Sequence, residues 1–289
     1  MVSLILNPKS GKRLGRARPL ADILIQHGLE VETFSTVPHG PAEAARRALQ
    51  SGSTTLVAAG GDGTINAVAS AAIASGATLG VMPSGTFNHF AKDMGLPLDP
   101  EEAAGVIAAG KVNNVDVGEV NGRVFLNNSS LGLYTRFAMF KEEHRKQGRT
   151  RALALFWAVL AVLRRIPFVE LRFHSGEEEV HRRTPLLFVG NNKYILDGKE
   201  AGTRLSLTEG VLCVYIVNVA SSADLLRFSV RALFRGLSAM PELEEIITSQ
   251  ASVSTGRKRA RVSMDGEVTR LDTPLHYSVR SAALKLLVP

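Results

Sequence analysis

The first 120 residues alternate short apolar runs with stretches of helical periodicity. The apolar runs predict four strands, at 2–6, 31–35, 54–58 and 79–82. Between them, helical periodicity predicts three helices, at 14–28, 42–51 and 64–75. Gly28 and Gly76 follow two of these helices, where a helix C-cap is expected. Strands that alternate with helices are typical of a mostly parallel sheet, so this part predicts an α/β domain.

The pattern changes after about Val117. Strand candidates now follow one another with Gly, Asn or Asp clusters between them, at 124–127, 169–174, 185–189, 211–217 and 262–264. Two helical stretches interrupt them, at 150–163 and 223–237, and a final strand is predicted at 282–288. We therefore expect a second, β-rich domain.

Composition narrows the class of protein. The chain has 289 residues, 45% of them hydrophobic, which is ordinary for a folded globular protein and excludes dominant disorder. Its single cysteine, Cys213, excludes a disulfide framework and cysteine-based zinc or iron–sulfur sites, and fits a reducing compartment. The N-terminus does not resemble a signal peptide, and the longest apolar run, Ala152–Leu163, is shorter than the roughly 20 residues of a membrane-spanning helix. These features predict a cytoplasmic protein that does not cross a membrane.

The charge is basic and unevenly distributed. There are 34 Lys and Arg against 27 Asp and Glu, a net charge of +7. Basic residues crowd 9–18 and flank the apolar run, at 145–151 and 164–165. They suit an anionic partner, namely nucleotide phosphates, nucleic acid or an anionic membrane surface, or else form an ordinary solvated surface.

The strongest local motif is Gly60-Gly61-Asp62-Gly63-Thr64-Ile65-Asn66, between a predicted buried strand and a helix. Three glycines in four positions indicate a backbone with positive φ or a ligand that approaches very closely. A helix N-terminus favours anions, so phosphate groups are the expected ligand. The alternative is a tight structural turn with Asp62 as helix N-cap. The motif is neither a Walker A loop nor the dinucleotide fingerprint, because Asn66 stands where the third glycine belongs.

Two further polar loops follow predicted strands of the same sheet. They are Asn7-Pro8-Lys9-Ser10-Gly11-Lys12 and Pro83-Ser84-Gly85-Thr86-Phe87-Asn88-His89. Because the ends of parallel strands meet at one edge of the sheet, where ligands bind in this class, we expect the three loops to converge.

In this order and spacing, NPKSG, GGDGTIN and PSGTFNHFAKDMGLP resemble the diacylglycerol kinase catalytic-domain family. That family includes bacterial lipid kinases and sphingosine kinases and is similar to the NAD kinases. NNSSLGLYTRF at 127–137 and Met264-Asp265-Gly266-Glu267 extend the resemblance over nearly the whole chain. It implies an α/β ATP-binding domain at 1–118, on which 276–289 packs back, and a β-rich, sandwich-like lipid-substrate domain at 119–275. The nucleotide is expected in the cleft between the two domains.

The resemblance also implies an ATP- and Mg²⁺-dependent transfer of phosphate to a lipid hydroxyl, of diacylglycerol or a related lipid. The motif positions implied to contact the nucleotide are Asn7, Lys9, Thr36, Gly60, Gly61, Asp62, Gly63, Thr64, Asn66 and Thr86. Glu267 matches the proton acceptor, and Asp265 and Asp62 would orient the hydroxyl or hold Mg²⁺. Phosphoryl transfer needs this positioning and charge neutralisation more than covalent help from the protein. From the residues alone, Asp265-Gly266 also reads as an ordinary hairpin turn with Glu267 merely exposed.

The chain departs from the family pattern at two places. His89 stands where an acid is common. In the loop that resembles the family's structural Mg²⁺ site, Glu209 keeps one carboxylate but Cys213 replaces the second acid, and a neutral thiol is a poor ligand for Mg²⁺. Glu209 is therefore the one residue carried over to that metal site, and an inactive nucleotide-binding regulator stays open beside an NAD kinase-like enzyme as an alternative function.

The expected partner is a lipid substrate at the inner face of a membrane, which the protein contacts peripherally. Ala152–Leu163, with Phe156, Trp157 and its basic flanks, suits a bilayer interface, although a core helix explains the same pattern. Gly256–Arg261 is predicted as a basic hairpin, and nucleic acid is not expected because no aromatic residue is interleaved there. A homodimer paired along a sheet edge is a further expectation.

Overall fold

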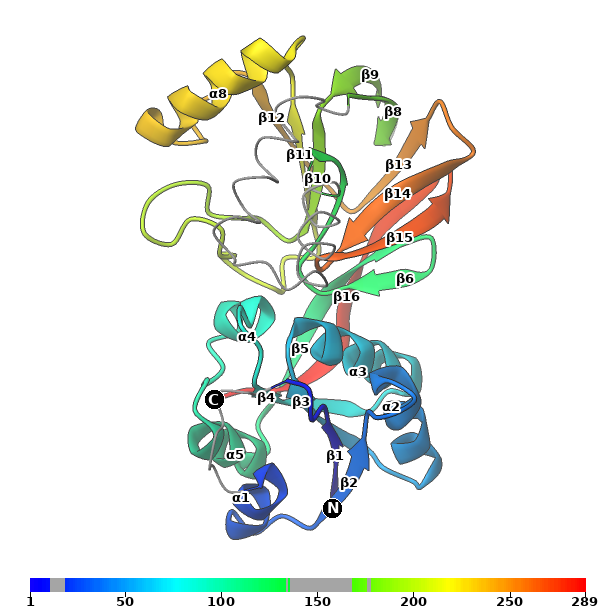
Figure 1. Cartoon of the computed structure of the whole chain (residues 1–289), viewed down its shortest axis with the longest axis vertical. Coiled ribbons are helices and arrows are strands. Elements are labelled where there is room, and N and C mark those ends of the chain that lie inside the picture. The colour runs from blue at the N-terminus through cyan, green and yellow to red at the C-terminus, as the bar shows by residue number, and fades with distance from the viewer. Residues whose placement is uncertain (11–18, 134, 136–167, 176–177) are drawn as a thin grey trace. The chain divides into compact units, whose positions relative to one another are not determined.

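A computed structural model describes residues 1–10, 19–133, 135, 168–175 and 178–289 (Figure 1). The chain divides into two compact units. Unit 1 comprises Met1–Val117 and Arg280–Pro289, and unit 2 comprises Gly118–Val279. The predicted helical stretch at 150–163 and the start of the predicted helix at 14–28 lie outside the described residues.

Unit 1 contains a parallel sheet with the strand order β2-β1-β3-β4-β16. Its strands are β1 (Val2–Leu6), β2 (Val31–Ser35), β3 (Thr55–Gly60), β4 (Thr78–Pro83) and the C-terminal part of β16 (Leu275–Leu287). β3 and β4 are buried along nearly their whole length, as continuous apolar runs are in the middle of a parallel sheet. β2 lies at the edge of the sheet and is mostly exposed.

Helices cover both faces of this sheet. They are α1 (Leu20–Gln26), α2 (Pro41–Gln50), α3 (Asp62–Ser75), α4 (His89–Asp93) and α5 (Pro100–Ala109). α1 packs against α5 on one side of the strands, and α2 against α3 on the other (Figure 1). α3 ends at Gly76 with a φ of 74°, a left-handed conformation that favours glycine. Leu4, Leu24, Val57, Ile107 and Leu287 belong to one buried cluster between the sheet and the α1–α5 layer.

Unit 2 is a sandwich of two largely antiparallel sheets. The first has the strand order β12-β11-β10-β7-β14-β15, and in the second the N-terminal part of β16 pairs with β13, followed by β8 and β9. The strands are β5 (Val112–Val120, which begins in unit 1), β6 (Arg123–Phe125), β7 (Asn128–Gly132), β8 (Val169–Ser175), β9 (Glu178–Thr184), β10 (Leu186–Asn191), β11 (Leu212–Val217), β12 (Leu243–Thr248), β13 (Gln250–Thr255), β14 (Arg259–Met264) and β15 (Glu267–Asp272). Leu131, Val189, Phe173 and Val253 belong to the core between the sheets, and α8 (Ser222–Arg235) packs on Val217 outside it.

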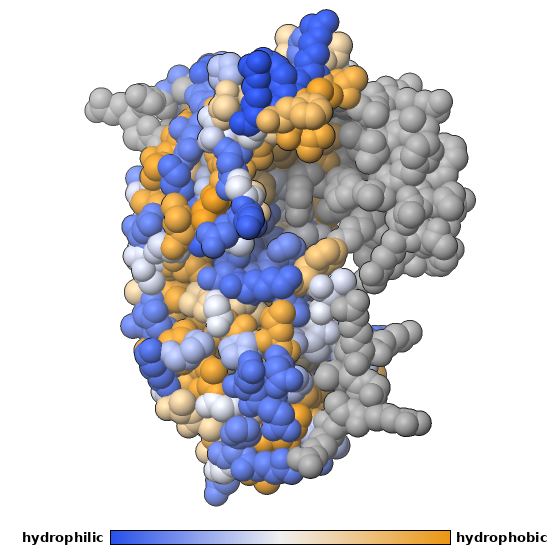
Figure 2. Space-filling view, turned by 90° about the vertical axis from the view of Figure 1, so that its left-hand side faces the viewer, coloured by the Kyte–Doolittle hydropathy of each residue, from blue (hydrophilic) through white to orange (hydrophobic). Residues whose placement is uncertain are grey.

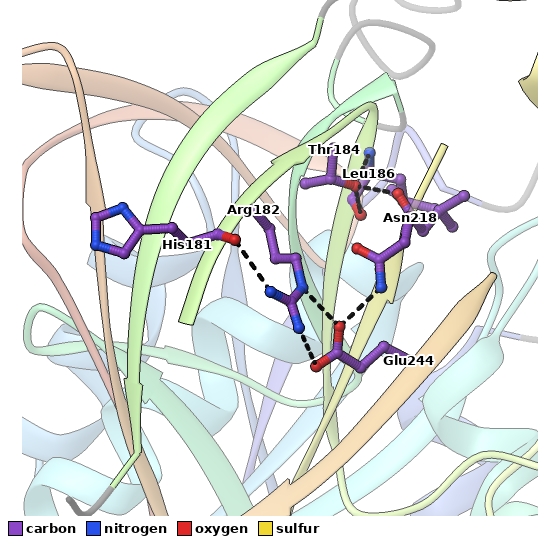
Figure 3. A network of polar contacts seen from close by, with 7 residues as sticks. His181, Arg182, Thr184, Leu186, Asn218 and Glu244 are labelled. Atoms are coloured by element: carbon purple, nitrogen blue, oxygen red, sulfur yellow. Dashed lines mark hydrogen bonds and ion pairs between the residues drawn. The ribbon is translucent and has the colours of Figure 1, made fainter. Parts of the chain in front are cut away.

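A polar network joins strands of the two sheets (Figure 3). Arg182 of β9 donates from Nε and Nη2 to the two Glu244 oxygens of β12, at 3.0 and 3.3 Å, and Asn218 Nδ2 donates to the same carboxylate at 2.8 Å. Burial would raise the pKa of Glu244, but these donors outweigh it and the pKa is lowered. The network links β9 to β12, each the last strand in its sheet order.

The structure corrects two predictions from the sequence pattern. Residues 124–127 do not form one strand, because β6 ends at Phe125 and β7 begins at Asn128. Gly256–Arg261 does not form a hairpin, because β13 and β14, on either side of Gly256–Lys258, belong to different sheets. Strands β9, β12, β13 and β15 were not predicted, since polar residues fill much of their length.

Candidate active site

The glycine-rich motif forms the junction between β3 and α3. Gly60 ends the strand, Gly61 is the helix N-cap and Asp62 is the first helical residue. Asp62 is therefore not the N-cap that the structural alternative assumed. A Cβ at Gly60 would lie 2.5 Å from Cβ of Thr64, so the close approach of Thr64 requires glycine there.

The loop after β1 contacts this junction. Asn7 donates from Nδ2 to the buried Thr64 hydroxyl at 2.9 Å, and its backbone N–H donates to the Ala59 carbonyl at 3.0 Å. Its own Oδ1 accepts the backbone N–H of Lys9 at 3.0 Å. Thus Asn7 and Thr64, far apart in the sequence, are brought together as the convergence of strand ends predicts.

The loop after β4 packs on the same junction. β3 and β4 pair in parallel with Gly60 opposite Pro83, so their following loops emerge side by side. A Cβ at Gly85 would lie 2.6 Å from Gly61 Cα, which means that the two glycine backbones touch. Asn88 adopts a φ of 52° and accepts the Gly85 N–H at 2.9 Å, and its own N–H donates to Asp62 Oδ2 at 3.1 Å. The sequence analysis did not single out Asn88, although asparagine is the non-glycine residue best suited to this conformation.

Asp62 has one carboxylate oxygen with no hydrogen-bond partner among the described residues. Oδ2 accepts from Asn88, but Oδ1 is buried and no described residue hydrogen-bonds to it. A buried, unpaired carboxylate oxygen is costly. It therefore fits a site whose cation or hydroxyl donor arrives with the ligand, and the surface formed by Gly61 and Gly85 fits a group that needs close backbone approach.

The remaining predicted nucleotide contacts lie around this junction in different environments. Thr86 and Lys9 are exposed, and Asn66 is half-buried on α3, where its carbonyl accepts the Ser70 hydroxyl at 2.9 Å. Thr36 is buried directly after β2, and its N–H donates to the Leu6 carbonyl at 3.0 Å. His89, the first residue of α4, stacks on the Phe87 ring at a centroid distance of 5.5 Å.

In unit 2, Asp265 and Gly266 form the two-residue turn between β14 and β15. Their φ values of 47° and 85° are those of a tight hairpin turn, with Met264 paired to Glu267. The hairpin reading of this motif is thus confirmed. The Asp265 carboxylate accepts three consecutive backbone N–H groups, of Leu126, Asn127 and Asn128, at 2.8, 2.8 and 3.1 Å. Burial raises the pKa of Asp265, while these amides and Arg204 act in the opposite direction.

Residues 126–128, which Asp265 holds through their backbone N–H groups, are also held by other side chains through their oxygen atoms. Arg204 is 6% exposed and donates to the Leu126 carbonyl at 2.6 Å and to Asn127 Oδ1 at 2.8 Å. Asn191 Nδ2 donates to the same Leu126 carbonyl, and the Tyr194 hydroxyl to the Asn127 carbonyl. Asp265 is therefore a clamp between the hairpin and the β6–β7 junction. Arg204 was not predicted, because no local pattern distinguishes a buried arginine in a loop.

Glu267 is the first residue of β15 and is exposed, directly after this clamped turn. Its backbone position is set by Asp265, whereas its side chain faces solvent. Such a carboxylate is suited to accept a proton from a bound hydroxyl group.

The predicted structural metal loop does not fit a metal ion. Among the described residues, no three His, Cys, Asp or Glu side chains are grouped as a metal site. Glu209 is exposed, and burial raises the pKa of the Cys213 thiol to about 12, so the thiol stays protonated at neutral pH. Cys213 Sγ lies 3.3 Å from Glu245 Oε1, which also pairs with Lys193 Nζ at 2.8 Å. A lysine ammonium group is thus the cation next to Cys213.

Comparison with known proteins agrees with this architecture. Residues 1–120 match the family model of the diacylglycerol kinase catalytic domain. A diacylglycerol kinase of Staphylococcus saprophyticus is 30% identical over 228 residues, 77% of this chain and 74% of that protein. A diacylglycerol kinase of Staphylococcus epidermidis is 31% identical over 77% of this chain and 72% of its own length.

Solved structures show the same fold. The crystal structure of a diacylglycerol kinase from Bacillus anthracis covers 100% of this chain and 96% of its own, with a TM-score of 0.72 and 22% identity. Yeast NADH kinase in complex with NADH covers 100% of this chain and 83% of its own, with a TM-score of 0.54 and 13% identity.

The chain thus has the architecture of a class of kinases. It combines a parallel α/β unit, with a glycine-rich strand–helix junction, and an antiparallel sandwich. Within that class, the chain belongs to the diacylglycerol kinase family. No helix among the described residues is long and apolar enough to span a membrane.

Proposed function

We propose that this protein transfers the γ-phosphoryl group of ATP to the hydroxyl group of a membrane lipid, diacylglycerol or a closely related lipid. The relatives of 30–31% identity that carry the name diacylglycerol kinase support this acceptor. The observation that carries the proposal is Asp62, one of whose carboxylate oxygens is buried without a partner among the described residues, at the contact between the Gly61 and Gly85 backbones. This place combines backbone N–H groups that suit an anion with a carboxylate oxygen that suits a cation, and a nucleotide with bound Mg²⁺ requires both.

Unit 1 binds the nucleotide in this proposal. The phosphates lie at the β3–α3 junction, on Gly60 to Thr64 and Asn66, where the backbone N–H groups at the start of α3 and the helix dipole favour negative charge. Asn7 orients the Thr64 hydroxyl through its 2.9 Å hydrogen bond. Lys9, Thr36 and Thr86 contact the nucleotide from the adjoining loops. Asp62 Oδ1 is the residue atom that would hold Mg²⁺, which supplies charge neutralisation to the phosphates when bound.

Glu267 accepts the proton of the lipid hydroxyl. As the lipid oxygen forms its bond to the γ-phosphorus, the bond from that phosphorus to the β–γ bridging oxygen breaks, and ADP leaves with the electron pair. The hydroxyl proton passes to the Glu267 carboxylate. Asp265 is a positioning residue, because its three amide contacts fix the turn that precedes Glu267.

The direct test is transfer of label from γ-labelled ATP, with Mg²⁺, to a panel of detergent-dispersed lipids and to NAD. Label in diacylglycerol or a related lipid supports the proposal. Label in NAD alone would assign the chain to the NAD kinase-like alternative, and ATP binding without transfer to any acceptor would identify an inactive nucleotide-binding protein.

Two variants test the roles of residues within this assay. Glu267→Gln is expected to lower kcat by about 10²-fold or more with nucleotide affinity retained, as loss of a general base does. Asp272→Asn is the matched control, because Asp272 is an exposed carboxylate in the same strand, paired with Arg259. Equal kcat values for the two variants would remove Glu267 from the mechanism.

A further inference from the structure

Arg204 is the one lysine or arginine that is buried among the residues that the structure describes, with 6% of its surface exposed. Lysines and arginines normally lie at the surface, and Figure 2 shows hydrophilic residues spread over the face of the molecule in view. Burial of a guanidinium group costs free energy unless hydrogen bonds and an opposite charge compensate for it. The contacts of Arg204 therefore indicate what its burial supports.

The loop between β10 and β11 holds Arg204 in place. Tyr194 and Arg204 form an antiparallel bridge in this loop, and the Ile195 N–H donates to the Thr203 carbonyl at 2.8 Å. The Arg204 guanidinium lies 5.9 Å from the centre of the Tyr194 ring, within the range of a cation–π interaction. The Tyr194 hydroxyl donates to the Asn127 carbonyl at 3.1 Å. Both residues of the bridge thus reach the junction between β6 and β7.

A single peptide group lies between Arg204 and Asp265. The peptide group that joins Leu126 to Asn127 accepts from Arg204 Nη1 at 2.6 Å through its carbonyl, and its N–H donates to Asp265 Oδ1 at 2.8 Å. Arg204 Nη2 also donates to Asn127 Oδ1 at 2.8 Å, and the Leu126 N–H donates to Asp265 Oδ2 at 2.8 Å. The peptide dipole has its negative end toward a cation and its positive end toward an anion, which strengthens both hydrogen bonds. Arg204 and Asp265 therefore fix this peptide group together.

The position of this backbone sets the turn before Glu267. The Asp265 N–H donates to the Asn128 carbonyl at 2.9 Å, and the Asp265 carboxylate accepts the Asn128 N–H at 3.1 Å. The turn that Asp265 forms with Gly266 leads directly to Glu267, the first residue of β15. A shift of residues 126–128 therefore shifts the turn and the backbone of Glu267. Such a shift matters for a proton acceptor, because a misplacement of about 1 Å can lower a rate on the order of 10²-fold.

We propose that Arg204 is a positioning residue for phosphoryl transfer. Through residues 126–128 and Asp265, it holds Glu267 where the carboxylate accepts the proton of the acceptor hydroxyl. This rests on the proposed function, in which Glu267 is the proton acceptor. Arg204 itself contacts no substrate and acts through the backbone. A merely structural role would lower stability and leave the kcat of folded protein unchanged, whereas a positioning role lowers the kcat of folded protein.

The test is the kinetics of label transfer to detergent-dispersed diacylglycerol, at a temperature where circular dichroism shows each variant to be folded. Arg204→Met keeps the length of the side chain and is expected to lower kcat at least about tenfold, with the KM for ATP within about twofold of wild type. Arg204→Lys keeps the charge but lacks the planar fork that bonds Leu126 and Asn127 together, so it is expected to recover part of kcat. Arg182→Met is the matched control, because Arg182 makes two hydrogen bonds to Glu244 elsewhere in unit 2, and it is expected to keep the wild-type kcat.

A double variant shows whether Arg204 acts through Glu267. Addition of Arg204→Met to Glu267→Gln is expected to lower kcat by less than about twofold further, because the positioned group no longer accepts a proton. Multiplied losses would overturn the proposal, as would a kcat of Arg204→Met equal to that of wild type or of Arg182→Met.

A milder variant applies the same comparison if Arg204→Met does not fold. Tyr194→Phe lacks only the hydrogen bond to Asn127 and is expected to lower kcat about threefold, again without a further loss beside Glu267→Gln. A wild-type kcat for Tyr194→Phe would then overturn the proposal. Failure of the proposed function is seen separately, since wild type itself would transfer label to no lipid, and this inference would fall with it.

Discussion

Replacement of Asp62 by asparagine tests whether this carboxylate is held ready for a ligand at a cost to the fold. In the protein without ligand, Asp62 Oδ1 is buried without a partner among the described residues, which costs about 1–3 kcal/mol. Asparagine keeps an oxygen for the Asn88 N–H, now 3.1 Å from Oδ2, and replaces the unpaired charge by a neutral amide, whose unpaired NH2 group still costs free energy but less than the charge did. Loss of the charge weakens that hydrogen bond by about 1 kcal/mol. Asp62→Asn is therefore expected to stabilise unit 1 by about 1 kcal/mol.

The assay is thermal unfolding with and without Mg²⁺ and a non-hydrolysable ATP analogue, alongside kcat. Without ligand, Asp62→Asn is expected to unfold about 3–5 °C higher than wild type. With ligand at about 100 times its Kd, wild type gains about 2.7 kcal/mol and the variant less, so the order reverses, and the variant has at least 10²-fold lower kcat. Asp22→Asn, an exposed acid on α1, is expected to change neither quantity. A ligand-free Asp62→Asn protein that unfolds below wild type would refute the reasoning, because Oδ1 would then have a stabilising partner.

Three further predictions concern unit 2. Asp265→Ala leaves three backbone N–H groups without their acceptor and is expected to lower the free energy of unfolding, measured with urea, by about 3 kcal/mol. The control Asp272→Ala is expected to change it by under about 0.5 kcal/mol, and equal losses for the two variants would contradict the role of Asp265 as a clamp. The Cys213 thiol, whose pKa burial raises from 9.0 to about 12, is expected to resist iodoacetamide at pH 8 until the protein unfolds. Because the pKa is higher in the folded state, the thiol's contribution to stability is present below pH 9 and is lost between pH 9 and 12. Mass spectrometry follows the alkylation, and a native protein that is alkylated as fast as the unfolded protein would argue against this burial. Chelation of divalent ions by EDTA without nucleotide is expected to leave the melting temperature of unit 2 within about 1 °C of its original value. A clear decrease would contradict this expectation and show that an ion stabilises the unit.

The sequence alone determined the parallel α/β part of the fold and the convergence of its loops. β3 and β4 are continuous apolar runs, and their burial in the middle of a sheet follows from that pattern. A Cβ at Gly60 would collide with Thr64 and a Cβ at Gly85 with Gly61 Cα, so these glycines in the sequence indicate places where the backbone is closely approached. The Asp265-Gly266 turn follows from a different property of its residues, since both adopt the positive φ that a two-residue hairpin turn of the Asp-Gly type requires.

Only the tertiary structure decided which polar groups meet. Asn88 reaches Asp62 across 26 positions and Asp265 reaches Leu126 across 139, and no local pattern encodes partners at such separations. Edge strands such as β9 and β12 carry many polar residues because one face is solvated, and their pairing depends on neighbours far along the chain. The same holds for α8, where apolar periodicity predicted the helix but only burial distinguishes Leu225 and Phe228, which pack inside, from the exposed Leu233 and Phe234. Local sequence sets backbone conformation and periodicity, whereas the choice of contact partners is made when the whole chain is packed.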